Sequence, residues 1–198
     1  MNTEISSTQN KRIKNLLQLQ DKSRNRRKEG KFVVEGLRET GLALKGGFDL
    51  IEVYFCPEFF SENEFKSIPN LENSNAEIIE ISSEVYKKLA YRQSTEGLLA
   101  VFASKENSLK TLNFSNDNPL ILVAEAPEKP GNIGAILRTA DAANVDAVFI
   151  ANPKTDLYNP NIIRSSVGCV FTNIIATGTT AEIIDFLQQK KNRKLVLI

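Results

Sequence analysis

The chain has 198 residues, 41% of them hydrophobic, which is enough for one large or two small domains with an ordinary core. It contains no histidine, which excludes Ser-His-Asp and Cys-His catalysis. Cys56 and Cys169 lack metal-like spacing, so we expect neither a disulfide framework nor a metal site. No apolar run approaches the roughly 20 residues that cross a membrane, and the polar first residues carry no signal peptide, so we expect a cytoplasmic protein.

Basic residues gather near the start of the chain, although the formal net charge is only +1. Residues 11–31 have an excess of seven positive charges, and this asymmetry is typical of a surface that binds a polyanion. The predicted contacts in this basic arm are Lys11, Arg12, Lys22, Arg24, Arg26, Arg27 and Lys28. The alternative is a solvated terminus whose leucines, Leu16 among them, dock part of it on the body.

The first hundred residues alternate between strands and helices. The predicted elements are strands at 32–34, 50–55, 77–81 and 97–103, and helices at 37–44, 57–65 and 82–89. Gly46 and Gly47 end the first helix, and Ser82 caps the last. These elements make a complete α/β unit, which a polar linker at residues 105–118 follows.

The remainder of the chain alternates again. The predicted elements are strands at 120–124, 147–150, 173–176 and 195–198, and helices at 133–142, 161–165 and 181–191. Strands that alternate with helices form a mostly parallel sheet, and its ligands bind beyond the carboxyl ends of the strands.

The most informative stretch, Glu128-Lys-Pro-Gly-Asn-Ile-Gly-Ala-Ile-Leu-Arg-Thr-Ala140, joins the first strand of the second unit to its helix. Helical periodicity puts Arg138 off the apolar face and above Gly134. Because Gly134 has no side chain, we expect that a ligand can approach the backbone beneath the guanidinium, a group suited to phosphate. Structural roles are the alternative: Asn132 as a helix N-cap, Gly134 as a packing glycine and Arg138 as a solvated residue.

Two motifs resemble those of the SpoU/TrmH family of RNA 2′-O-ribose methyltransferases, in the knotted SPOUT superfamily. Asn132-Ile-Gly-Ala-Ile-Leu-Arg-Thr-Ala140 is similar to the first motif, and Asn159-Pro-Asn-Ile-Ile-Arg-Ser-Ser-Val-Gly-Cys-Val-Phe171 to the second. The resemblance implies an α/β protein in two parts. Residues 1–104 would form a ribosomal-protein-like RNA-binding domain, and residues 119–198 a partial SPOUT domain with a Rossmann-like parallel sheet.

The resemblance also implies a reaction. A methyl group would pass from S-adenosylmethionine to a ribose 2′-hydroxyl of RNA, with ribosomal RNA favoured over transfer RNA. Arg138 would be the central catalytic residue, which fixes an RNA phosphate and stabilises negative charge, because a guanidinium keeps its proton. Asn132 would position the loop or the ribose.

The second motif has two interpretations. The resemblance implies that Arg164, Ser166 and Gly168 form a wall of the site and a contact of a homodimer, when the protein is full length. The alternative is a short structural helix with Asn159 as its cap and Gly168 past its end.

The sequence departs from the family pattern in two places. Arg92-Gln-Ser-Thr-Glu-Gly97 stands where many relatives carry His-Gln-Gly, so that histidine's role is in doubt; Arg92 is a further predicted RNA contact. The third motif threads the knot and supplies most of the cofactor pocket, and it would follow Ile198. We therefore expect no knot, no cofactor-binding residues and no activity in these 198 residues. The alternatives are a fragment of a longer protein and a natural form that has lost the cofactor site.

Two other functions are consistent with parts of the sequence. One is a non-catalytic RNA-binding protein that uses the N-terminal domain and the basic arm. The other is a doubly wound enzyme that acts on a small nucleotide, and the pairing of Arg138 and Asn132 with the second motif disfavours it.

Overall fold

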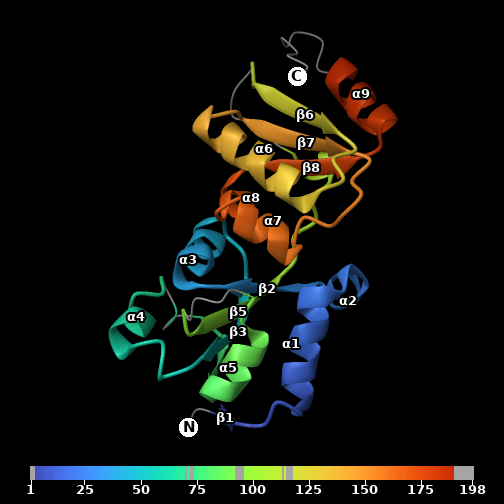
Figure 1. Ribbon diagram of the computed structural model, residues 1–198. Helices are drawn as coiled ribbons and strands as arrows, with labels where there is room; N and C mark the ends of the chain where they lie inside the picture. Colours follow the sequence, from blue (N-terminus) through green and yellow to red (C-terminus); the bar gives the residue numbers. More distant parts are fainter. Residues whose placement is uncertain are drawn as a thin grey trace. The chain divides into compact units, whose positions relative to one another are not determined.

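A computed structural model describes residues 3–69, 71, 74–91, 96–112, 114 and 118–189. The chain divides into two compact units, Met1–Lys105 and Glu106–Ile198, and Figure 1 shows the elements of each. Two predicted features, the contact by Arg92 and the strand at 195–198, lie outside the described residues.

The first unit is built on a five-stranded sheet of order β1-β4-β3-β5-β2. Its strands are β1 (Thr3–Ile5), β2 (Lys31–Glu35), β3 (Leu50–Phe55), β4 (Glu77–Ile81) and β5 (Leu98–Ala103). β4 pairs in parallel with β1 and β3, whereas β5 runs antiparallel to β3 and β2. The sequence did not predict β1, because this short edge strand in a polar segment has a single buried apolar side chain, Ile5.

The α-helices that the structure describes beside this sheet are α1 (Lys11–Asp21), α2 (Ser23–Glu29), α3 (Leu37–Lys45), α4 (Glu62–Lys66) and α5 (Ser83–Leu89). The prediction of a helix at 57–65 was wrong in its first turn. Residues 57–60 form a turn, and α4 begins after Ser61, which makes a capping box with Glu64.

The basic arm is ordered and docked. Ile13, Leu16 and Leu19 of α1 are buried in the same core cluster as residues of β4 and α5. The amide of Gln20 donates a hydrogen bond to the backbone oxygen of Leu89, 2.8 Å away, which ties the end of α1 to the end of α5. A short helix gains most of its stability from packing its apolar face against the rest of the protein. Because α1 is packed in this way, the basic side chains that it carries have a fixed place.

Gly97, which precedes β5, has a left-handed backbone with φ of 71°. A Cβ there would lie 2.8 Å from the backbone carbon of Phe59 and from the nitrogen of Phe60. Both the conformation and the space therefore require glycine.

We expect Gly97→Ala to lower the free energy of unfolding by about 2 kcal/mol or more, through backbone strain and overpacking. Gly41→Ala is the control, because Gly41 lies within α3 and has open space where a Cβ would be added. Urea denaturation should show the control unchanged or stabilised by about 0.5–1 kcal/mol. Equal stabilities of the two variants would contradict this role of Gly97.

Among its described residues the second unit has a three-stranded parallel sheet of order β6-β7-β8, formed by β6 (Ile121–Glu125), β7 (Ala147–Ala151) and β8 (Ile175–Gly178). Glu125 pairs with Ala151, and Ala151 pairs with Gly178, so the three carboxyl ends lie at one edge. Every residue of β7 is buried, as expected for the central strand of a covered parallel sheet.

The helices of this unit are α6 (Pro130–Ala142), α7 (Pro160–Ser165), α8 (Cys169–Thr172) and α9 (Thr180–Gln189). Ile183 of α9 packs in one cluster with Phe149 of β7, while α6, α7 and α8 pack on one another. The sequence did not predict α8. The left-handed Gly168 is its N-cap, and the helix delays the start of β8 to Ile175.

Part of the predicted linker belongs to the second unit, which corrects the prediction of a linker over residues 105–118. The backbone nitrogen of Thr177 donates to the oxygen of Asn107 at 2.7 Å, beside β8. A short 3₁₀ helix, η2 (Leu109–Thr111), follows, and Leu109 and Leu112 pack against the core.

Candidate functional site

The first motif opens α6 immediately beyond the carboxyl end of β6. Pro130 occupies the first helical position, and Lys129 at the N-cap makes no side-chain capping bond. Asn132 is therefore not the N-cap, which was the structural alternative for it. Its side chain is exposed and makes no hydrogen bond within the described part of the chain, so its amide is available to a ligand.

Arg138 lies off the buried face of α6, as its spacing predicted, and is exposed. Among the described residues its guanidinium makes no hydrogen bond or ion pair. Arg138 follows Asn132 by six residues, which corresponds to about 9 Å of rise and roughly 240° of rotation along a helix. The two predicted catalytic residues therefore lie on different faces of α6.

Ser165 of α7 occupies the space where a side chain at Gly134 would lie. A Cβ at Gly134 would lie 2.7 Å from the Cβ and from the carbonyl carbon of Ser165. The Ser165 hydroxyl also donates to the backbone oxygen of Pro130 at 3.4 Å. The prediction that a ligand approaches the backbone at Gly134 was wrong, because this position is where the two motif helices touch.

The contact has a consequence for charge. Arg138 follows Gly134 by one helical turn, and Arg164 immediately precedes Ser165. Both arginines are exposed. Each motif therefore has a positively charged side chain within about one helical turn of the contact between α6 and α7. Two such guanidinium groups suit a phosphate.

Gly134→Ala should force α7 away from α6 and lower the free energy of unfolding by about 1–3 kcal/mol. Gly131→Ala, in the first turn of the same helix, should have almost no effect, because no described atom outside the helix lies within 4 Å of the added Cβ. Thermal denaturation of both variants checks this difference. Equal stabilities of the two variants would contradict this prediction, because they would show that α7 can shift away from α6 at almost no cost in free energy.

Ser166 and Gly168 have structural roles. The Ser166 side chain is buried; its hydroxyl donates to the oxygen of Ile163 at 3.0 Å and accepts from the nitrogen of Val170 at 3.3 Å. Gly168 has φ of 84°, which allows the chain to turn from α7 into α8. The hydroxyl of Ser166 is thus committed to the α7–α8 corner and is not available to a ligand. Asn159 does cap α7, since its side chain accepts from the nitrogen of Asn161.

Sequence reasoning missed a polar group at the carboxyl edge of the sheet. Glu125 ends β6, Asn152 follows β7 and Thr180 begins α9 after β8, and their side chains hydrogen-bond to one another. The hydrogen bonds from Thr180 and Asn152, together with the nearby charge of Lys154, hold the pKa of the Glu125 carboxyl below its usual range. Their positions at or just beyond the carboxyl ends of strands were the only available signal.

Arg26, a predicted RNA contact, is buried. Its guanidinium nitrogen Nη1 donates to the backbone oxygens of Leu19 at 2.6 Å and Gln20 at 2.8 Å, at the end of α1. This corrects the prediction: the charge of Arg26 stabilises carbonyl groups at a helix end and is not presented to a polyanion.

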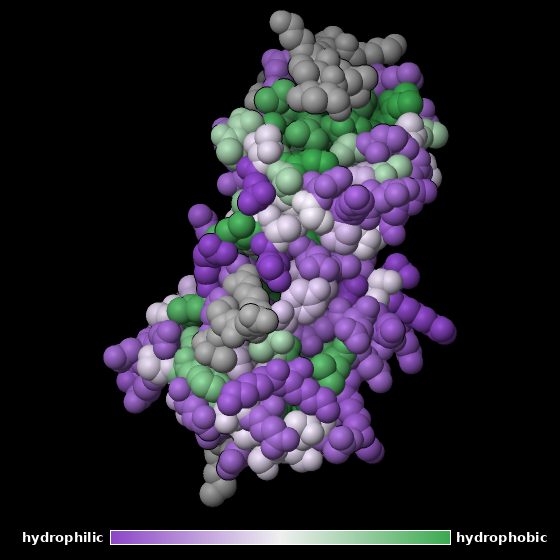
Figure 2. Space-filling view, viewed as in Figure 1, coloured by the Kyte–Doolittle hydropathy of each residue, from purple (hydrophilic) through white to green (hydrophobic). Residues whose placement is uncertain are grey.

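The other basic side chains predicted to contact RNA in the arm are exposed, and one of them forms an ion pair within the protein. Arg12 forms an ion pair with Glu77 at 2.8 Å, and the pKa of its guanidinium is raised mainly by this hydrogen bond. Figure 2 shows hydrophilic side chains over α2. The exposed members of the predicted set are Lys11, Arg12, Lys22, Arg24, Arg27 and Lys28.

Arg26→Gln should lower the free energy of unfolding by about 2 kcal/mol, because it removes a buried charge-assisted pair of hydrogen bonds. Arg27→Gln, at the neighbouring exposed position, should stay within about 0.5 kcal/mol of the parent. In RNA-binding titrations, Arg27→Gln alone should reduce the slope of log K against log salt, by up to about one unit. The reverse pattern would restore Arg26 to the RNA-binding set.

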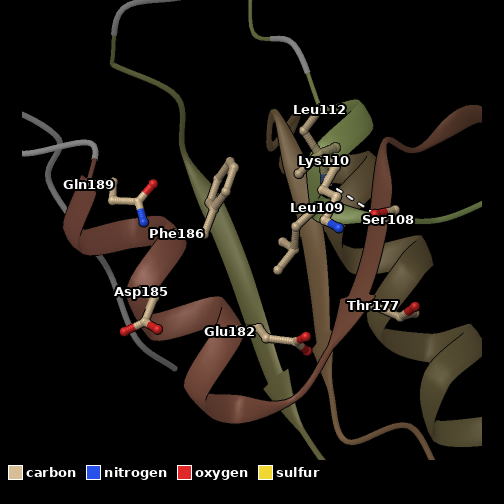
Figure 3. Close-up of a pocket in the computed structure, with 9 residues that line it drawn as sticks. All are labelled: Ser108, Leu109, Lys110, Leu112, Thr177, Glu182, Asp185, Phe186 and Gln189. Carbon is tan, nitrogen blue, oxygen red and sulfur yellow. Dashed lines mark hydrogen bonds between the residues drawn. The ribbon is translucent and has the colours of Figure 1, made fainter.

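The second unit also contains a cavity of about 550 Å³ between η2 and α9 (Figure 3). Its lining residues are Ser108, Leu109, Lys110, Leu112, Thr177, Glu182, Asp185, Phe186 and Gln189. Glu182 accepts from the nitrogen of Thr179 at 2.7 Å, so its carboxylate caps α9. No residue of either sequence motif lines this cavity.

The described residues contain no helix long and apolar enough to span a membrane. They also contain no group of three or more His, Cys, Asp or Glu side chains placed to hold a metal ion.

Each of the two units matches a known protein family. Residues 10–100 match the MRM3-like substrate binding domain, and residues 119–198 match the SpoU rRNA Methylase family. The crystal structure of an RNA 2′-O ribose methyltransferase is 36% identical, with a TM-score of 0.77, over 96% of this chain and 70% of that chain. The chain belongs to the SpoU methylase family. The predicted resemblance and the α/β fold class are thereby confirmed.

Two further relatives are longer than this SpoU-family chain. Mitochondrial rRNA methyltransferase 3 of Homo sapiens is 29% identical over 150 residues, which are 74% of this chain and 34% of that protein. The chain thus spans about a third of the length of this relative. An AdoMet-bound rRNA methyltransferase from Sinorhizobium meliloti has the same fold, with a TM-score of 0.81 at 22% identity, over 95% of this chain and 69% of that one.

Proposed function

We propose that this protein transfers a methyl group from S-adenosylmethionine to a ribose 2′-hydroxyl of RNA, and that the RNA is ribosomal. The observation that carries the proposal is Arg138, whose guanidinium is exposed, at the predicted place in the first SpoU motif, with no partner among the described residues. The match to an rRNA methylase family supports ribosomal RNA as the substrate.

Arg138 performs an electrostatic task. A ribose hydroxyl is a poor nucleophile, so a site must orient it and help remove its proton. A guanidinium keeps its own proton, so Arg138 binds an RNA phosphate beside the reacting ribose and stabilises the negative charge that develops. Arg164, exposed near the same helix seam, adds a second positive charge.

Asn132 serves the other end of the motif helix. Its amide offers both a donor and an acceptor at the start of α6, close in sequence to the carboxyl end of β6. In a parallel sheet this edge is where ligands bind, so Asn132 orients the ribose or the loop that contacts it.

S-adenosylmethionine, when bound, supplies the methyl group. The second unit fits such a ligand, because its three strands end at one edge with polar side chains beyond them. Glu125, Asn152 and Thr180 form that polar edge. Their acceptor oxygens suit the ammonium and hydroxyl groups of the cofactor.

RNA binding belongs to the first unit in this proposal. The family match to a substrate binding domain supports it, as do the exposed cations on α1 and α2. Such contacts reach phosphates and carry little sequence information.

We also propose that the full-length protein is a homodimer that pairs through the second motif. The support is the family resemblance together with the exposed position of Arg164 on α7. Size-exclusion chromatography with light scattering on the full-length protein should give twice the mass of one chain. The mass of a monomer would contradict the pairing.

The proposed reaction is tested with the full-length product of the gene, tritiated S-adenosylmethionine and unmodified ribosomal RNA. A ribose 2′-O-methyl group blocks alkaline cleavage of the next phosphodiester, so the label should appear in alkali-resistant dinucleotides. Label in mononucleotides would indicate base methylation, and absence of label would overturn the proposal.

Arg138→Ala should reduce methyl transfer by at least about a hundredfold, the scale of one lost electrostatic contact in the transition state. Its melting temperature should stay within a few degrees of the parent, because the side chain is exposed. Thr139→Ala, at the next exposed position of α6, is the control and should keep both properties. Comparable activity in the Arg138 variant would remove the catalytic assignment, and a large loss of stability would indicate a structural role.

A further inference from the structure

Three side chains form a closed ring across the carboxyl edge of the β6-β7-β8 sheet, and we call it the rim network. The amide nitrogen of Asn152 donates to Oε1 of Glu125 at 3.0 Å and to Oγ1 of Thr180 at 2.7 Å. The Thr180 hydroxyl in turn donates to Oε2 of Glu125 at 2.7 Å. The ring thus joins the segments that follow all three strands.

The hydrogen bonds of the ring use all of its side-chain donors but leave acceptors free. Asn152 uses both of its N–H donors and Thr180 its single O–H donor, whereas an ionised carboxylate has none. The amide oxygen of Asn152 accepts no hydrogen bond from the described residues, and Glu125 has further lone pairs. The rim network therefore presents acceptors only, and it suits a ligand that brings donors or positive charge.

The backbone beneath the ring is shaped for a close turn. Ala126 and Asn152 have left-handed backbones, with φ of 44° and 47°. Their nitrogens donate at 2.8 Å to the oxygens of the next strand's end, Ala126 to Ala151 and Asn152 to Gly178. Asparagine adopts this conformation more readily than most residues, and the rim network adds a tertiary restraint on Asn152.

We propose that Asn152 is a positioning residue for the cofactor. The rim network holds the loops after β6, β7 and β8 together, so that the acceptors of this edge meet the ammonium and hydroxyl donors of S-adenosylmethionine. This inference rests on the proposed function. It assigns cofactor contacts to residues outside both sequence motifs, contrary to the sequence-based expectation of none within these 198 residues.

The variant Asn152→Asp tests the proposal. It replaces the double donor with a carboxylate that repels Glu125, with almost no change of shape. Asn144→Asp is the matched control: Asn144 also has a left-handed backbone, with φ of 50°, but it is exposed and precedes β7 at the opposite end of the strands. Thr180→Val, which removes only the hydroxyl, provides a second variant if Asn152→Asp fails to fold.

The measurements are calorimetric titration of the full-length protein with S-adenosylmethionine, RNA affinity by filter binding, and thermal denaturation. Asn152→Asp and Thr180→Val should each weaken cofactor binding by about tenfold or more, which corresponds to about 1.4 kcal/mol. RNA affinity should stay within about twofold, and Asn144→Asp should match the parent in both.

The outcomes separate two failures. Unchanged cofactor affinity in the folded Asn152 and Thr180 variants, or an equal loss in Asn144→Asp, would overturn the positioning role while leaving the reaction intact. A parent protein that binds RNA but no S-adenosylmethionine would overturn the proposed function itself, together with this assignment.

Discussion

The contact between Gly134 and Ser165 is the constraint on which the arrangement of the site depends. Helix α6 carries the first motif and α7 the second, and they approach so closely that no side chain fits between them at Gly134. Because protein interiors are close-packed, this contact admits one relative placement of the two helices. Arg138 and Arg164 are exposed and each lies close along its own helix to this contact, and glycine is required there for packing rather than for ligand access.

Charges of one sign serve two different purposes in the first unit. Arg26 is interior and neutralises the carbonyl groups that end α1, whereas Arg24 and Arg27 on the same short helix are exposed. An arginine can therefore fix the geometry of a basic surface without belonging to it. Burial of Leu16 and Leu19 then attaches that surface to the sheet.

The sequence predicted most of the elements because their signals are local. The strands at 50–55 and 77–81 agree residue for residue with β3 and β4, since short apolar runs between polar segments mark their own ends. The errors arose where tertiary contacts decide. A capping box shortened α4, and the left-handed Gly168 inserted α8 ahead of the third parallel strand.

Site residues were predictable only where a motif brought them together along the chain. Arg138 and Asn132 stand in one such motif, and both are exposed as ligand contacts must be. Glu125, Asn152 and Thr180 are far apart in sequence, and the register of the parallel strands alone makes them neighbours. Nothing local distinguishes Arg26 from Arg27, because burial of a guanidinium depends on where the end of α1 lies.

Placement of a 2′-O-methyl group on ribosomal RNA through Arg138 is what we propose for this SpoU-family protein. Its most direct test is mass spectrometry of nucleosides and mapped fragments of ribosomal RNA, taken from cells that lack the gene and from cells that carry it again. One 2′-O-methylated nucleoside should disappear on deletion, return with the parent gene and stay absent with Arg138→Ala. An unchanged set of ribosomal 2′-O-methyl groups after deletion would contradict it.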